Sequence, residues 1–180
     1  LQNIPTKDEE GKKIRKAFLP VNDLFFSADY SQMELRVLAH ISGSKELQEA
    51  FIKDEDIHTR VAADIYGIPI SEVNAKMRKT AKAVIFGIVY GISGFGLGEN
   101  LEISPKEAKE FINKYYELYP GVKQYMDNIV SDAYKNGYVK TLFNRKRVID
   151  ELNNKNFMIR TSGERIAMNT PIQGTSADIM

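Results

Sequence analysis

Apolar residues recur every three or four positions along most of this 180-residue chain, which is the spacing of helices with one buried face. The spacing predicts a helix over 33–52 with a break at Ser42-Gly43-Ser44, a helix over 57–66 that stops at Gly67, and a long helix over 76–90. A fourth helix opens at Ser104-Pro105-Lys106-Glu107, and a fifth runs from Pro120-Gly121 to Gly137. The last helix begins near Glu164 and is interrupted at Pro171. Ser71 is expected to cap the rise into the 76–90 helix, and the glycines at 91–98 are expected to form a helix stop and a pliable loop.

Two segments have a strand pattern instead. The run Leu24–Ala28 is short, apolar and aromatic, which suits a buried strand. Residues 138–143 and 146–149 flank Asn144-Arg145 as a hairpin. Many helices and few strands place the chain in the α+β class.

Composition narrows the class of protein further. The chain is 43% apolar and 27% charged, which supports a packed core and excludes wholesale disorder. It has no cysteine, so a disulfide framework and a Cys-ligated zinc site are excluded. No apolar run approaches the ~18–20 residues that cross a bilayer. Neither Leu1 nor the last residues carry a start or stop signal, so we expect an excerpt of a longer protein.

Charge is unevenly distributed although the formal net charge is only +1. Residues 76–98 contain four cations and no acid, and residues 135–147 contain five cations and no acid. Acid-free basic stretches of this kind suggest contact with a polyanion. The alternative is that these charged residues simply face water.

The predicted 76–90 helix presents a candidate nucleotide surface. Arg78, Lys82, Phe86 and Tyr90 recur every four residues and therefore fan over one broad helix face. Cations at one end and aromatic rings at the other suit the phosphates and the base or sugar of a nucleoside triphosphate. The alternative is that the two rings belong to the core and the cations decorate the surface.

Asp29 directly follows the predicted strand, where its carboxylate could hold Mg²⁺ or merely cap the next helix. His40 and His58 form no metal-ligand pattern, and no hydrolase motif is present.

Two longer motifs are more specific. Residues 29–36 read Asp-Tyr-Ser-Gln-Met-Glu-Leu-Arg, and residues 78–91 read Arg-Lys-Thr-Ala-Lys-Ala-Val-Ile-Phe-Gly-Ile-Val-Tyr-Gly. These resemble motif A and motif B of the family A DNA polymerases, the DNA polymerase I type. Residues 1–5 and 169–174 fall in the family's order, so the resemblance covers the whole chain.

The resemblance implies a mostly helical fingers subdomain on part of an antiparallel-sheet palm, an incomplete right-hand polymerase fold. Residues 1–38 would be palm with motif A, 39–160 the fingers with the motif B helix, and 161–180 a return helix toward the palm. One departure is Ile85, which stands where family members usually have Asn.

The resemblance also assigns roles to individual residues. Asp29 would bind both catalytic metals, with the Tyr30 main-chain carbonyl as a further ligand, and Lys82 would share the catalytic role. Glu34, supported by Tyr90, would exclude a ribose 2′-OH. The implied nucleotide-binding residues are Gln32, Glu34, Arg78, Lys82, Phe86 and Tyr90, and the implied DNA-binding residues are Arg36, Arg165, Asn169 and Gln173.

The implied activity is template-directed DNA synthesis by two-metal phosphoryl transfer. The partners of such an enzyme would be primer–template DNA and dNTPs, and its cofactors would be two Mg²⁺ ions, with Mn²⁺ as a substitute. The parent enzyme would be a monomer in the cytoplasm of a bacterium or of a phage-infected host. The family's motif C, a His-Asp-Glu turn, is absent, so the 180 residues alone are expected to be inactive. A non-catalytic binding module, one half of a split polymerase, and an RNA polymerase (against which Glu34 argues) remain as alternatives.

Overall fold

The computed structural model describes residues 4–5 and 8–180. It divides the chain into two compact units, 1–31 and 32–180, which are considered separately. In the first unit, helix α1 (Glu9–Lys16) begins at Asp8, whose side chain accepts a hydrogen bond from the Gly11 N–H at 2.6 Å. The Arg15 guanidinium donates to the Ile4 carbonyl at 2.9 Å and fastens the helix to the preceding segment.

The predicted strand at Leu24–Ala28 is wrong for this structure. The segment has no regular secondary structure, and Leu24 and Phe26 are 85% and 94% exposed. A strand needs a neighbour for its N–H and C=O groups, and the described residues of this unit provide none. Asp29 therefore lies in exposed, irregular backbone and not at the end of a strand.

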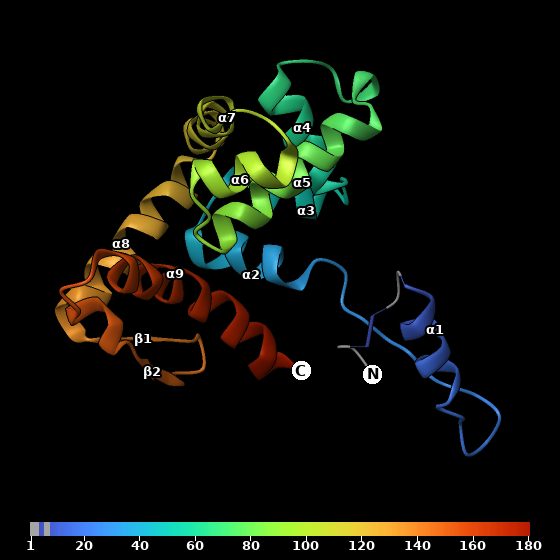
Figure 1. Ribbon diagram of the computed structural model, residues 1–180. Helices are drawn as coiled ribbons and strands as arrows, with labels where there is room; N and C mark the ends of the chain where they lie inside the picture. The colour runs from blue at the N-terminus through green and yellow to red at the C-terminus, as the bar shows by residue number, and fades with distance from the viewer. Residues whose placement is uncertain (1–3, 6–7) are drawn as a thin grey trace. The chain divides into compact units, whose positions relative to one another are not determined.

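The second unit is largely helical (Figure 1). Its elements are α2 (Met33–Ser42), α3 (Lys45–Ile52), α4 (Ile57–Tyr66), the 3₁₀ turn η1 (Ile70–Glu72), α5 (Ala75–Val89), α6 (Gly94–Leu101), α7 (Pro105–Leu118), α8 (Pro120–Asn136), β1 (Tyr138–Lys140), β2 (Lys146–Val148), the 3₁₀ turn η2 (Asp150–Asn153) and α9 (Phe157–Ile179). Within the part of the chain that the structure describes, no helix combines the length and the apolar character needed to cross a membrane.

Several predicted boundaries are confirmed. Gly43 and Gly67 end α2 and α4 in the left-handed conformation, at φ 63° and 67°, which glycine adopts without the steric cost of a Cβ. The Ser104 hydroxyl accepts a hydrogen bond from the Glu107 N–H at 3.2 Å, and Pro105 is the first residue of α7. The α+β class is confirmed, with β1 and β2 as an antiparallel pair that matches Tyr138 with Val148.

Two predictions for the segments on either side of α5 are wrong. Asn74, not Ser71, caps α5, because the Asn74 side chain accepts from the Met77 N–H while Ser71 lies inside η1. The glycine series is not a loop throughout: a Ser93 cap restarts the chain as α6, and the contact of Leu97 with the core stabilises it.

The last helix also differs from the prediction. It begins at Phe157, capped by Asn156, and continues through Pro171 without a break. Proline removes one backbone hydrogen bond, but Pro171 and Ile172 are both buried, and their packing outweighs that local cost.

A single large apolar cluster joins α2 to α8 and reaches Ile172 on α9. Its most buried members include Leu38, Val61 and Val84, which bring α2, α4 and α5 together. A smaller cluster, formed by Ala133, Val139, Ile149, Leu152 and Ala167, seats the β1–β2 hairpin on α8 and α9. Helix α5 is thus held in the core along one face and is exposed along the other.

Candidate nucleotide-binding site

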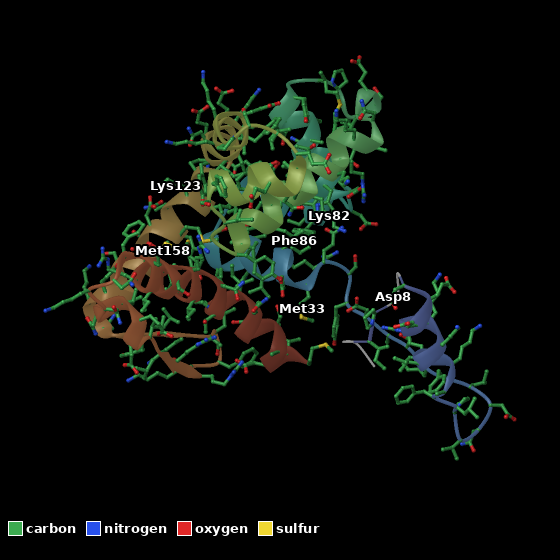
Figure 2. All side chains as sticks on the ribbon, in the orientation of Figure 1. Asp8, Met33, Lys82, Phe86, Lys123 and Met158 are labelled. Atoms are coloured by element: carbon green, nitrogen blue, oxygen red, sulfur yellow. The ribbon has the colours of Figure 1, made fainter. Side chains whose placement is uncertain are left out.

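Helix α5 separates its residues into a core face and a site face. Arg78, Lys82 and Tyr90 are exposed and Phe86 is half-buried, which confirms that they lie outside the fully buried core. The Lys82 ammonium is 5.8 Å from the centre of the Phe86 ring, and both side chains are labelled in Figure 2. The Phe86 and Tyr90 rings are nearly parallel, with centres 6.3 Å apart. The predicted order of cations followed by aromatic rings is therefore present on one surface.

The core face of α5 explains the departure at Ile85. This side chain is 1% exposed and packs in the apolar cluster with Val84 and Ile88. An apolar residue at this position therefore contributes to the core and leaves the site face of α5 unchanged.

His58, on the first turn of α4, is a member of this site that the sequence did not reveal. Its ring stacks on Phe86 with centres 6.2 Å apart, and its Nδ1 is buried with no hydrogen-bond partner among the described residues. Burial lowers its pKa; the charge of Asp56 opposes this, and the charges of Arg78 and Lys82 add to it. The ring is therefore mostly neutral at pH 7. No spacing pattern marks His58, because its role depends on the packing of α4 against α5.

Asp56, the residue that caps α4, is the second unforeseen member. Its carboxylate accepts hydrogen bonds from Arg78 Nε at 2.6 Å, the Thr59 hydroxyl at 2.8 Å and the His58 N–H at 3.1 Å. Partial burial by itself would raise the pKa of Asp56, but these hydrogen bonds and the Arg78 charge outweigh it and lower the pKa to about 2. The carboxylate is thus ionised at neutral pH and paired with a predicted phosphate-binding residue.

Hydrogen bonds connect three segments that the sequence separates widely. The Tyr90 hydroxyl donates to Glu34 Oε2 on α2 at 3.4 Å and accepts from Gln173 Nε2 on α9 at 3.1 Å. The Asn169 side-chain amide donates to the Val89 carbonyl at 3.4 Å. The predicted sugar-gate carboxylate, the end of the nucleotide helix and two predicted DNA-binding residues therefore meet at one place.

The close approach of α9 to the end of α5 depends on Gly91. This residue has φ 62°, and a Cβ built on it would lie 2.6 Å from Met168 Cε and 3.0 Å from Arg165 Cγ. The predicted DNA-binding residue Arg165 is exposed beside this contact. A glycine at 91 is thus required both by the backbone angle and by the space available.

Gln32 and Arg36 lie at the start of α2. Gln32 precedes the first helical residue in a left-handed conformation, and its carbonyl accepts from the N–H groups of Leu35 and Arg36. The exposed Arg36 guanidinium lies 4.7 Å from the centre of the Phe51 ring. Among the described residues, Gln32 has no hydrogen bond to the four residues of the α5 face.

Asp29 and Tyr30 belong to the first unit and are described within it. Both are exposed. Among residues 4–5 and 8–180, no group of three or more His, Cys, Asp or Glu side chains is arranged to hold a metal. Carboxylate and main-chain carbonyl oxygens are nevertheless ligands that Mg²⁺ prefers, so these two residues fit part of such a site.

A basic cleft of about 400 Å³ opens between the hairpin and α9 and extends the site. Its lining includes Arg145, Arg147, Thr170 and Gln173, the last of which also bonds Tyr90. Arg147 donates to the Thr170 hydroxyl at 3.3 Å, which holds this cation over α9. The basic residues of the 135–147 stretch that line this cleft therefore lie next to the candidate nucleotide surface on α5, and Gln173 belongs to both.

A cationic and aromatic helix face beside a basic cleft is the kind of surface that suits nucleotides and nucleic acid. The chain belongs to DNA polymerase family A, whose family model matches residues 1–180. The resemblance inferred from motifs A and B is thereby confirmed.

Individual relatives agree with this assignment. The chain is 57% identical to DNA polymerase I of Bacillus caldotenax and of Bacillus subtilis, over 100% of this chain and 21% of each relative. Among solved structures, it is similar to the POL domain of Pol1 from M. smegmatis in complex with DNA primer-template and dNTP, with a TM-score of 0.87 and 41% identity. That match covers 99% of this chain and 32% of the other. The chain thus spans about a fifth of the length of its curated relatives.

Proposed function

We propose that these 180 residues form the nucleotide-binding fingers and part of the palm of an enzyme that performs template-directed DNA synthesis. Such an enzyme adds deoxynucleoside monophosphates in the 5′-to-3′ direction to a primer 3′-OH. The observation that carries the proposal is the hydrogen-bonded connection Glu34–Tyr90–Gln173, since it joins both motifs and the primer–template segment. Residues 1–38 serve as palm, 39–160 as fingers and 161–180 as the return helix.

The site face of α5 receives the incoming nucleotide. Arg78 and Lys82 neutralise the triphosphate, and Phe86 provides a flat surface for the base or sugar. His58 borders the same surface through its stacking on Phe86. Gln32 and Glu34 lie on the sugar side, where the Tyr90 hydrogen bond orients the Glu34 carboxylate against a ribose 2′-OH.

Asp29 and the Tyr30 carbonyl hold divalent metal in this proposal, with Mg²⁺ as the ion and Mn²⁺ as a substitute. When bound, two such ions supply activation of the primer 3′-OH and charge stabilisation of the departing pyrophosphate. To this reaction the chain would contribute the oxygen ligands of Asp29 and Tyr30 and the cations on α5. Of these cations, Lys82 lies next to the aromatic ring of Phe86.

Primer–template DNA is the macromolecular partner. Arg36, Arg165, Asn169 and Gln173 contact it, and the basic cleft beside Gln173 provides further phosphate contacts. The bacterial relatives favour the cytoplasm of a bacterium, or of a phage-infected host, as the place where the monomeric enzyme works.

A binding titration tests the nucleotide site. Calorimetry with dATP in MgCl₂ is expected to give saturable binding that Arg78→Ala together with Lys82→Ala abolishes. Lys76→Ala is the matched control for Lys82→Ala, because it removes the same charge from the same helix outside the four-residue fan. Equal losses for the Lys76 and Lys82 variants would contradict a specific phosphate site.

A second titration tests the sugar gate. Glu34→Ala is expected to raise the affinity for ATP toward that for dATP, since the carboxylate that excludes the 2′-OH is gone. Unchanged sugar selectivity would refute the gate assignment and leave the phosphate site standing.

Binding without turnover is the second candidate for the 180 residues by themselves. It is favoured by the absence of any His-Asp-Glu triplet from the sequence. Primer extension by the chain alone would exclude this candidate, whereas extension only after addition of a polypeptide with such a turn would identify a split enzyme.

A further inference from the structure

Asp56 is the N-terminal cap of α4 and contacts the cationic end of α5. Its Oδ2 accepts from Arg78 Nε at 2.6 Å, and the same carboxylate accepts from the Thr59 hydroxyl and from the His58 N–H. We propose that Asp56 is a positioning residue for the incoming nucleotide, which holds the Arg78 guanidinium ready for the triphosphate. This inference rests on the proposed nucleotide site and adds to it a residue from outside both polymerase motifs.

The position of the Asp56 carboxylate is fixed independently of Arg78. Two of its three hydrogen bonds come from the first turn of α4, so the helix itself orients the oxygen that faces α5. Helix α4 is in turn fastened to the junction of α7 and α8, because the buried hydroxyl of Tyr119, which lies between these helices, donates to Asp64 at 2.6 Å. Asp56 is therefore a rigid anchor for a long and otherwise adaptable side chain.

The geometry of the contact leaves Arg78 able to bind phosphate. Only Nε is used by Asp56, and in the part of the chain that the structure describes neither Nη group donates a hydrogen bond. These two groups provide four N–H donors, which is the fork that recognises phosphate oxygens. A guanidinium that is held through Nε loses less rotational freedom when the triphosphate binds.

Charge repulsion and positioning predict opposite changes in triphosphate affinity when Asp56 is replaced, so the direction of the change distinguishes them. Asp56 carries a negative charge beside a site for a polyanion, so its removal would strengthen triphosphate binding if repulsion dominated. Positioning predicts that its removal weakens binding. Salt of 0.15 M reduces the long-range repulsion, since the screening length is then about 8 Å.

The test is calorimetric titration of the 180-residue chain with dATP in MgCl₂ at that salt concentration. Asp56→Asn keeps a good helix cap and removes the charge. Its matched control is Glu55→Gln, which removes the same charge one residue away from a side chain that pairs with Arg60 and not with Arg78. We expect Asp56→Asn to weaken dATP binding about five- to tenfold and Glu55→Gln to change it less than about twofold.

A double-mutant cycle separates positioning from a purely structural role. In an Arg78→Ala background, Asp56→Asn is expected to have no further effect on dATP binding, because the residue through which it acts is gone. A capping role would give the same loss in both backgrounds and would overturn the inference, as would tighter binding by Asp56→Asn alone. If Arg78→Ala together with Lys82→Ala leaves dATP binding intact, the proposed nucleotide site itself is refuted. If Asp56→Asn binds dATP as well as the unchanged chain while Arg78→Ala binds it poorly, only the positioning role of Asp56 is refuted.

Discussion

The ion pair between Asp56 and Arg78 makes a quantitative prediction about stability and pH. The pKa of Asp56 falls from its ordinary 3.8 to about 2, because the hydrogen bonds and the Arg78 charge outweigh the opposing effect of partial burial. At about 1.4 kcal/mol per pH unit, this corresponds to roughly 2.4 kcal/mol without screening. The Arg78 and Asp56 side chains are 46% and 38% exposed, so solvent reduces the expected contribution to about 1 kcal/mol.

The direction of the pH dependence follows from the lowered pKa. The folded state holds the ionised carboxylate more strongly than the unfolded state, so the stabilisation is fully present above about pH 4 and is lost as the pH falls toward about 2. The perturbation is Asp56→Asn. The assay is urea unfolding of both proteins, followed by circular dichroism, at several pH values across that window.

The expected result is a stability difference of about 1 kcal/mol at neutral pH that disappears near pH 2. Asp56 also influences the pKa of His58, so the comparison is repeated in an Arg78→Ala background, where the part carried by Arg78 is expected to vanish. A stability difference that stays constant from neutral pH to about 2 would refute the reasoning, because it would show that the charge of Asp56 contributes nothing.

Three further substitutions test the packing around the site, each by urea unfolding. Tyr115→Phe is expected to be neutral or to stabilise by up to about 1 kcal/mol, since it removes a hydroxyl that is buried without a partner among the described residues; a clear loss would reveal a missed hydrogen bond. Tyr119→Phe is expected to cost about 1.5–3 kcal/mol through the lost bond to Asp64, and a cost near zero would contradict that bond. Gly91→Ala is expected to cost about 1–2 kcal/mol from its left-handed backbone, plus the displacement of Met168, and wild-type stability would exclude that conformation.

The helices could largely be predicted because their signals are local. The apolar spacing, the stop at Gly67 and the Ser104 cap depend on residues within one turn of each other, and the structure confirms them. The predictions that failed depend on distant contacts instead. Burial of Pro171 in α9 overrides a local helix breaker, and the 24–28 run lacks a neighbouring strand among the described residues of its unit.

The candidate site divides in the same way. The Arg78, Lys82, Phe86 and Tyr90 face was predictable, because helical spacing alone places residues four apart on neighbouring positions of one surface. His58 and Asp56 were not predictable, since they reach this surface only through the packing of α4 against α5.

Helix α5 explains why the two kinds of information meet in one site. Its buried face, with Ala81, Val84 and Ile88 at most 3% exposed, fixes its rotation and height against α4. Once that face is fixed, the backbone positions of the exposed cations and rings are also fixed relative to Asp56 and His58 at the start of α4. The contacts at Tyr90 then join this pair of helices to Glu34 on α2 and Gln173 on α9. The geometry of the candidate nucleotide surface is therefore a consequence of the core, and changes in the packing of α5 should alter the proposed nucleotide binding even where no site residue is substituted.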